Sequence, residues 1–232
     1  YNGIAQGAHL EYSSRNWNWR VQQEYISEDF TSEVGFVPRN NYLKFEGSLG
    51  YQFLPASDKV VSHGPQYRGF YFFNPNMNAT DYVSIVGYRV DFMDRSSLSA
   101  DVFNEYVRLL APFDPTNTGQ EQLATNTRHH WNGVYLQYNS RPKSLFTYNL
   151  TTRLGRYFAS GYRTNLNAEM GYRFQPYVSL GANISYNNLD LPAPWYTTDF
   201  WLVGTEADIT FTNKLFWSTL VQYNEQNNNF GV

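Results

Sequence analysis

The chain has 232 residues, of which 42% are hydrophobic, 19% aromatic and 16% charged, whereas typical soluble domains carry about 25% charged residues. No stretch approaches the roughly 18 consecutive apolar residues of a transmembrane helix, and the aromatic content excludes a disordered chain. The net charge of -3 gives no basic field for nucleic acid. The absence of cysteine excludes disulfides, thiolate metal sites and cysteine nucleophiles.

Alternation of apolar and polar residues runs through most of the chain and predicts β-strands. The pattern is clear from Tyr42 to Leu54, from Tyr162 to Phe174 and from Val178 to Tyr186, and helical spacing fits these segments poorly. We expect about twelve strands, at residues 3–14, 16–26, 41–54, 60–73, 80–93, 96–107, 130–140, 144–155, 161–174, 177–187, 199–211 and 214–224. The fourth is the least regular, because Gly64-Pro65 interrupts it.

Strand length and loop length favour a membrane protein over a soluble sandwich or propeller. Several strands exceed the typical 5 to 6 residues or so of globular strands and suit the ~9–11 tilted residues that cross a bilayer. Tight turns at residues 13–16, 55–59, 94–96, 140–143, 175–176 and 212–213 alternate with longer connections at 27–40, 74–79, 108–129, 156–160 and 188–199. Transmembrane barrels sort short periplasmic turns from long extracellular loops in this way. We therefore predict an all-β fold, an antiparallel transmembrane β-barrel.

Aromatic residues near the strand ends are candidates for two membrane-interface girdles, where amphipathic rings lie among lipid headgroups. The alternative is an ordinary hydrophobic core. The candidates beside short turns are Trp17, Phe53, Phe92, Phe146, Phe174, Phe211 and Trp217, and those near longer loops are Tyr25, Tyr42, Tyr82, Tyr106, Tyr162, Tyr186, Trp201 and Tyr223.

Charged residues of both signs occupy the alternate strand positions and are candidates for a lumen wall. They are Arg20, Glu24, Lys44, Glu46, Arg89, Asp91, Asp101, Glu105, Arg153, Arg163, Glu169, Arg173, Glu206 and Asp208. A mixed-charge lumen conducts water and small polar solutes, or is filled by a plug or loop. The alternative is that opposite charges only solvate and brace the wall.

The direction of the chain leads us to expect that residues 1–232 are a barrel segment, incomplete at both ends. The first strand runs into a short turn and the last begins after one, so both ends fall on the extracellular side. Bacterial barrels keep their termini in the periplasm, and lipid requires every strand edge to be paired. We expect about 14 or more strands in the complete barrel.

Histidines at the rim are the candidates for catalysis, since some outer-membrane barrels are hydrolases. His129 and His130 follow the longest loop and His63 lies in the irregular fourth strand, but no Gly-x-Ser-x-Gly or His-Glu-x-x-His motif is present. Adjacent histidines on a strand point to opposite faces, which spoils a joint metal site. Residues 113–121 resemble a loose Ca²⁺ loop, although their spacing fails the EF-hand pattern and favours a turn built on Asp and Pro. We expect no enzyme activity and no catalytic, metal or cofactor site.

Two stretches carry a resemblance to a known family. Residues 28–42, EDFTSEVGFVPRNNY, and the ending 223–232, YNEQNNNFGV, resemble the region after an early hairpin and the loop before the last hairpin in a family of large Bacteroidota outer-membrane proteins of unknown function. The resemblance implies a carbohydrate-binding-like sandwich domain upstream, a C-terminal barrel and a final strand pair beyond this chain. It implies no catalytic residues.

These observations predict an outer-membrane protein of a Gram-negative bacterium that passes or imports a polar solute or glycan through its lumen. The alternatives are a structural or assembly subunit of an outer-membrane complex and, less favoured, a rim-located hydrolase. The expected partners are the lipid bilayer, lipopolysaccharide, other outer-membrane proteins or a surface lipoprotein, and a glycan. Nucleic acid is not expected.

Overall fold

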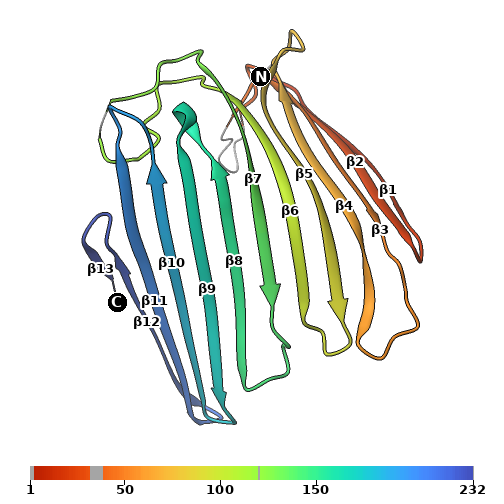
Figure 1. Cartoon of the computed structure of the whole chain (residues 1–232), viewed down its shortest axis with the longest axis vertical. Coiled ribbons are helices and arrows are strands. Elements are labelled where there is room, and N and C mark those ends of the chain that lie inside the picture. Colours follow the sequence, from red (N-terminus) through yellow and green to blue (C-terminus); the bar gives the residue numbers. More distant parts are fainter. Residues whose placement is uncertain (1–2, 32–38, 120, 232) are drawn as a thin grey trace.

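A computed structural model describes residues 3–31, 39–119 and 121–231. In these residues the chain forms one antiparallel sheet of 13 strands, in which each strand pairs with its neighbours in sequence (Figure 1). The strands are β1 (Ala5–Ser13), β2 (Trp17–Ile26), β3 (Tyr42–Tyr51), β4 (Val60–Phe73), β5 (Ala79–Phe92), β6 (Ser97–Arg108), β7 (Arg128–Asn139), β8 (Phe146–Arg156), β9 (Tyr162–Phe174), β10 (Val178–Asp190), β11 (Thr197–Thr212), β12 (Leu215–Asn224) and β13 (Asn229–Gly231). A 3-10 turn, η1 (Phe158–Ser160), lies between β8 and β9.

All twelve expected strands are present, with ends within a few residues of those predicted, so the all-β antiparallel fold is confirmed. The sheet is not closed into a barrel, because β1 and β13 form its two edges. In the described part of the chain no helix is both long enough and apolar enough to cross a membrane.

The ending of the chain differs from the prediction. We expected residues 225–232 to be a loop, but a four-residue turn after Asn224 leads into β13, which pairs with β12 through Gln222–Gly231, Tyr223–Phe230 and Asn224–Asn229. Asn228 adopts a positive φ of 46°, which asparagine tolerates better than most residues. A turn rich in asparagine therefore reverses the strand where the sequence pattern indicated a polar loop.

The connections fall into two groups at opposite ends of the sheet (Figure 1). One end, the short-turn end, carries the tight turns after β1, β3, β5, β7, β9 and β11. The other, the long-loop end, carries the connections after β2, β6, β8 and β10, of which the β6–β7 connection is the longest in the described chain. The connections after β4 and β12 are at the long-loop end too. By the bounds of the described strands, only the connections after β2 and β6 are long, with 15 and 19 residues, whereas those after β4, β8, β10 and β12 have 4 to 6 residues and are no longer than the 8 residues after β3 or the 6 after β7. The predicted alternation of tight turns with longer connections is therefore only partly correct.

The irregular fourth strand is real, and its glycine and proline lie where pairing is interrupted. The β3–β4 ladder stops at Gly50–Gln66 and resumes at an isolated bridge between Phe53 and His63. A Cβ at Gly64 would meet the carbonyl oxygen of Tyr51. Only glycine permits this close approach of the two backbones.

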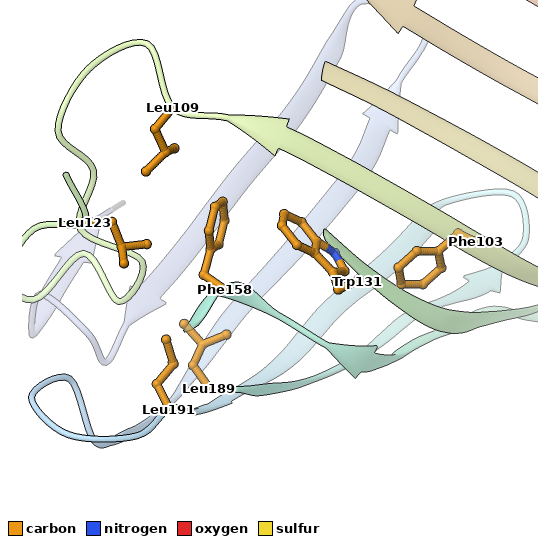
Figure 2. Packing of buried hydrophobic residues seen from close by; sticks show 7 residues of the cluster. All are labelled: Phe103, Leu109, Leu123, Trp131, Phe158, Leu189 and Leu191. Carbon is orange, nitrogen blue, oxygen red and sulfur yellow. The ribbon is translucent and has the colours of Figure 1, made fainter. Parts of the chain in front are cut away.

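Most of the buried hydrophobic residues form a single cluster at the long-loop end. It consists of Phe103, Leu109, Leu123, Trp131, Phe158, Leu189 and Leu191. Figure 2 shows these side chains enclosed by the curl of the sheet and by the connections that fold against it. The sheet is therefore curved around a core at one end rather than packed against a second sheet.

Candidate functional site

The ladders decide which residues share a face of the sheet, because directly paired residues project the same way and adjacent residues project oppositely. We call the face that carries Asp101 the inner face and the opposite one the outer face. On β6 the inner residues Ser97, Ser99, Asp101 and Phe103 are buried, whereas the residues between them are exposed. The inner face is therefore the enclosed one.

Every charged residue expected on a lumen wall lies on the inner face. The pairing register places there Arg20, Glu24, Lys44, Glu46, Arg89, Asp91, Asp101, Glu105, Arg153, Arg163, Glu169, Arg173, Glu206 and Asp208. Two pairs join neighbours on one strand, Lys44 with Glu46 at 2.9 Å and Arg89 with Asp91 at 2.8 Å. Because these charges neutralise one another along the wall, bracing contacts account for part of the set.

Near the middle of the inner face lies Asp101, only 2% exposed. Its carboxylate accepts a hydrogen bond from Gln66 Nε2 at 2.9 Å and lies 3.9 Å from the guanidinium of Arg68. A buried carboxylate is stable only when such donors replace its water. Two residues of β4 thus hold a charge on β6 across the intervening β5.

A second carboxylate on β6, Glu105, joins three strands of the inner face. It accepts hydrogen bonds from Trp131 Nε1 on β7, at 2.6 Å, and from the guanidinium of Arg153 on β8. The same guanidinium lies 4.5 Å from the ring centre of Phe103, a cation–π contact. Because Trp131 and Phe103 also belong to the buried hydrophobic cluster, this network joins the polar wall to that cluster.

The long-loop end of the inner face is partly covered by the β6–β7 connection. Leu109 and Leu123 of this connection enter the buried cluster, and Phe113 and Leu123 form an isolated bridge that folds it back on itself. The carbonyl oxygen of Glu121 accepts a hydrogen bond from Trp195, between β10 and β11. The connection therefore reaches from β6 across the ends of β8 and β9.

The β6–β7 connection is also held by the turn after β12. Gln226 Nε2 donates to the carbonyl oxygen of Thr116 at 3.2 Å, a contact between residues 110 positions apart. Thr116 is the most buried residue of the connection, 1% exposed. Alternation did not predict this covering element, and the signal that the sequence offered was the set of apolar residues in the loop, among them Leu109, Phe113 and Leu123.

Asp114 gives the β6–β7 connection its shape. One carboxylate oxygen accepts hydrogen bonds from the amide and hydroxyl of Thr116, at 2.9 and 2.7 Å. The other accepts from the amides of Thr118 and Gly119, at 2.9 and 2.8 Å. Burial raises the pKa of Asp114, but these hydrogen bonds outweigh it and leave the pKa below its ordinary value.

Residues 113–121, which the sequence suggested as a turn rather than a cation site, thus have their carboxylate Asp114 occupied by the loop's own donors. Residue 120 of this run lies outside the described residues. Across the described chain, no three His, Asp or Glu side chains gather in a metal-binding arrangement.

A cavity of about 770 Å³, lined by both polar and apolar groups, lies on the inner face between β9 and β13. Among its lining residues are two expected on the lumen wall, Glu169 and Glu206. Amides contribute most of the remaining polar groups, from Asn167, Asn183, Gln222 and Asn224. Such carboxylate and amide groups donate and accept hydrogen bonds to hydroxyl groups of a polar ligand.

The other expected wall residues have separate roles. Glu24 accepts a hydrogen bond from the Tyr42 hydroxyl, and the Arg163 guanidinium lies 4.7 Å from the Tyr157 ring centre. Arg173 donates to the carbonyl oxygens of Pro142 and Ser144, so it holds the β7–β8 turn.

The outer face carries all but one of the aromatic residues expected in the girdles, and many of their rings touch in rows. At the short-turn end the ring centres of Trp17, Tyr51, Phe53, His63 and Tyr88 follow one another at 4.7 to 5.9 Å. At the long-loop end Tyr71, Tyr82 and Tyr106 stack at 5.7 and 5.3 Å, and Tyr186 lies 4.8 Å from Trp201. The register places Tyr25, Phe92, Phe146, Phe174, Tyr162, Trp217 and Tyr223 on the same face, and Phe211 is exposed beside a register shift.

Tyr42 does not belong to a girdle, so that prediction was wrong. It projects from the inner face, is 7% exposed and packs on Phe72 with a ring-centre separation of 5.5 Å. The guanidinium of Arg39 contacts both rings and pairs with Asp81 at 2.6 Å. These residues anchor the end of the run 28–42, of which residues 32–38 lie outside the described residues.

The side chains of the three histidines considered for catalysis do not share a site. His129 projects inward and touches Phe158, whereas His130 projects outward and is bonded to Asn104. His63 lies at the short-turn end, hydrogen-bonded to the Tyr88 hydroxyl. The opposite directions of His129 and His130 confirm the alternation that the sequence predicted.

Fold and faces together define a class: an all-β antiparallel meander whose exposed face is apolar and aromatic and whose enclosed face is polar. A family model described as "Domain of unknown function (DUF5916)" matches residues 1–230. The chain therefore belongs to this uncharacterised family, in agreement with the expectation of a family without known function. Neither the curated proteins nor the solved structures contain a match to the chain.

Proposed function

We propose that the sheet is part of the wall of a transmembrane β-barrel in the outer membrane of a Gram-negative bacterium. The observation that carries the proposal is the contrast between its faces. Between the two aromatic rows the outer face exposes apolar side chains, among them Val86 and Val102, each 59% exposed, and Leu150, 45% exposed. Exposing such an apolar surface to water is unfavourable, whereas lipid chains provide an apolar solvent for it.

Closure of this barrel needs further strands between β13 and β1. Each of these edge strands pairs on one side only, and unpaired backbone groups in lipid cost several kcal/mol each. A complete barrel of about 14 or more strands accommodates the present sheet. The resemblance of residues 28–42 and 223–232 to Bacteroidota outer-membrane proteins adds a carbohydrate-binding-like domain upstream to this proposal.

The proposed activity is the passage of a polar solute or glycan along the inner face, without catalysis. The cavity beside Glu169 and Glu206 offers hydrogen-bonding groups to hydroxyl-rich molecules. The β6–β7 connection would narrow the extracellular mouth, because its anchors at Trp195 and Gln226 draw it across the inner face. Opposite charges on the wall support little preference between anions and cations.

Single-channel conductance of the full-length protein in a planar bilayer tests this proposal. We expect steady openings that neutral oligosaccharides reduce, because a bound sugar occupies the cavity beside Glu169 and Glu206. Glu206→Gln should weaken the block, while Asp58→Asn, in an exposed turn at the short-turn end, should leave it unchanged. A correctly inserted protein that never conducts would overturn the passage of solute.

A further inference from the structure

A notch interrupts the sheet at the long-loop end, between β7 and β8. The β7–β8 ladder ends at the pair Gly133–Gly155, yet β7 continues to Arg128 and rises beyond the tip of β8 (Figure 1). On the inner side Phe158 closes the gap by packing against Trp131, with ring centres 4.7 Å apart. A cavity of about 540 Å³ remains, lined by Arg128, His129, His130, Arg156 and residues of the β8–β9 connection. We call it the basic notch.

The basic notch concentrates positive charge without a neutralising partner. Arg128 lies directly opposite Arg108 in the β6–β7 ladder, and like charges in that position destabilise a sheet. Among the described residues no carboxylate lies within ion-pair distance of Arg108, Arg128 or Arg156. The Arg108 guanidinium donates to Asn126 Oδ1 at 3.0 Å, while its buried Nε atom has no hydrogen-bond partner within the described part of the chain. An anion bound beside Arg128 would offset its repulsion with Arg108, which lies opposite it on β6.

The position of the basic notch identifies the source of the anion. His130 pairs with Tyr106 on the outer face, and Tyr106 belongs to the long-loop aromatic row. Arg156 lies 4.3 Å from the ring centre of outward-facing Tyr162 and donates to the carbonyl oxygen of Ser160 at 3.3 Å. The notch thus opens at the level of the rings that, under the proposed function on which this step rests, contact lipid headgroups.

We propose that the basic notch binds a phosphate group of a phosphorylated glycolipid in the outer leaflet of the membrane. Arg128 and Arg156, which line the cavity, supply charge-assisted hydrogen bonds, and Arg108 on β6 adds its positive charge beside Arg128. Arginine suits this role because its planar fork matches phosphate oxygens.

Lipid retention by the full-length protein tests the proposal. The protein is inserted into phosphatidylcholine vesicles and then extracted with a mild detergent in the presence of bisphosphorylated lipid A, fully dephosphorylated lipid A or inorganic phosphate. Native mass spectrometry counts the bound molecules. The variant is Arg128→Gln with Arg156→Gln. The control is Arg141→Gln with Lys143→Gln, which removes two positive charges from the exposed turn at the other end of β7 and β8.

We expect bisphosphorylated lipid A to be retained at least about tenfold better than the dephosphorylated form, and the double variant to lose this preference while the control keeps it. Equal retention of both lipids by the wild type, or an unchanged preference in the double variant, would overturn the proposal. Displacement of the lipid by millimolar inorganic phosphate would overturn the assignment to a glycolipid. Flotation with the vesicles distinguishes the two proposals. A protein that floats but shows no preference for phosphorylated lipid A contradicts only this inference. A protein that does not float contradicts the barrel as well.

Discussion

Single carboxylates on and beside β6 organise much of the inner face. Glu105 joins Trp131 and Arg153 from two following strands, and Asp114 shapes the connection that leads to β7. Strand alternation predicted that Glu105 projects inward, because its direction depends only on its position in the strand. Its partners could not be predicted, because they depend on the register of three strands.

Asp114 makes the β6–β7 connection sensitive to acid. Its pKa is lowered in the folded protein, so its contribution to loop stability is complete above the ordinary carboxyl pKa of about 4 and is lost as the pH falls through the lowered value. We expect the exchange-protected amides of Thr118 and Gly119 to lose protection below about pH 4, after correction for intrinsic exchange.

The same hydrogen-exchange measurement on Asp114→Asn should show weak protection at every pH, with a loss of about 1–2 kcal/mol in the local opening free energy. Asp58→Asn serves as the control, because its side chain is in an exposed turn at the opposite end. Full protection of Thr118 and Gly119 in Asp114→Asn would show that the carboxylate does not hold the loop.

Among the structural elements, the strands agree closely with those predicted from the sequence, whereas the conformations of the connections were not predicted. The period of two located all twelve expected strands, including β4 with its glycine and proline. The β6–β7 connection has no period, and its buried residues Leu109 and Leu123 belong to a cluster that includes side chains from β6, β7, η1 and β10. A local sequence pattern therefore could not predict that this connection folds over the inner face. It also did not predict the short strand β13 after an asparagine-rich turn.

Phe158 is the contact through which η1 joins this covering element. Its ring lies 5.0 Å from Phe113 and 4.7 Å from Trp131, centre to centre, and it is buried. Phe158→Ala should cost about 3–4 kcal/mol of packing free energy. We expect protease cleavage within the β6–β7 connection to accelerate while the strands stay folded.

The matched control is Phe146→Ala, which removes a ring that is 46% exposed on the outer face at the short-turn end. It should leave cleavage of the connection unchanged. Equal protection of the connection in Phe158→Ala and in the wild type would show that it is held without η1.

At the scale of the whole molecule, the two faces of one sheet require different surroundings. The inner face buries Asp101 and the Glu105 network, whereas the outer face exposes valine, leucine and rings of aromatic residues. A soluble protein would cover such a face with another layer, but the described chain forms a single sheet. The proposed lipid surroundings follow from this arrangement.

A charge placed on either face of β7 distinguishes lipid from water. Val134 is outward and 40% exposed, so Val134→Arg should oppose insertion by about 2–4 kcal/mol if it lies near the middle of the bilayer. Gln137→Arg, three residues further along β7 on the inner face, should insert nearly as well as the wild type. The measurement is the fraction of full-length protein that floats with phosphatidylcholine vesicles. Equal flotation of the two variants would contradict a lipid-facing outer surface.

The strands, their antiparallel order and the division of charged and aromatic residues between two faces can be predicted from the amino-acid sequence, because each follows from a local period of two and from short turns. Tyr42 shares the inner face with Lys44 and Glu46 by the same alternation, whereas what covers the inner face and which arginines line the basic notch depend on the tertiary structure. These features depend on contacts between residues far apart in the chain, such as Thr116 with Gln226. They arise when the curl of the sheet brings distant strands and connections together.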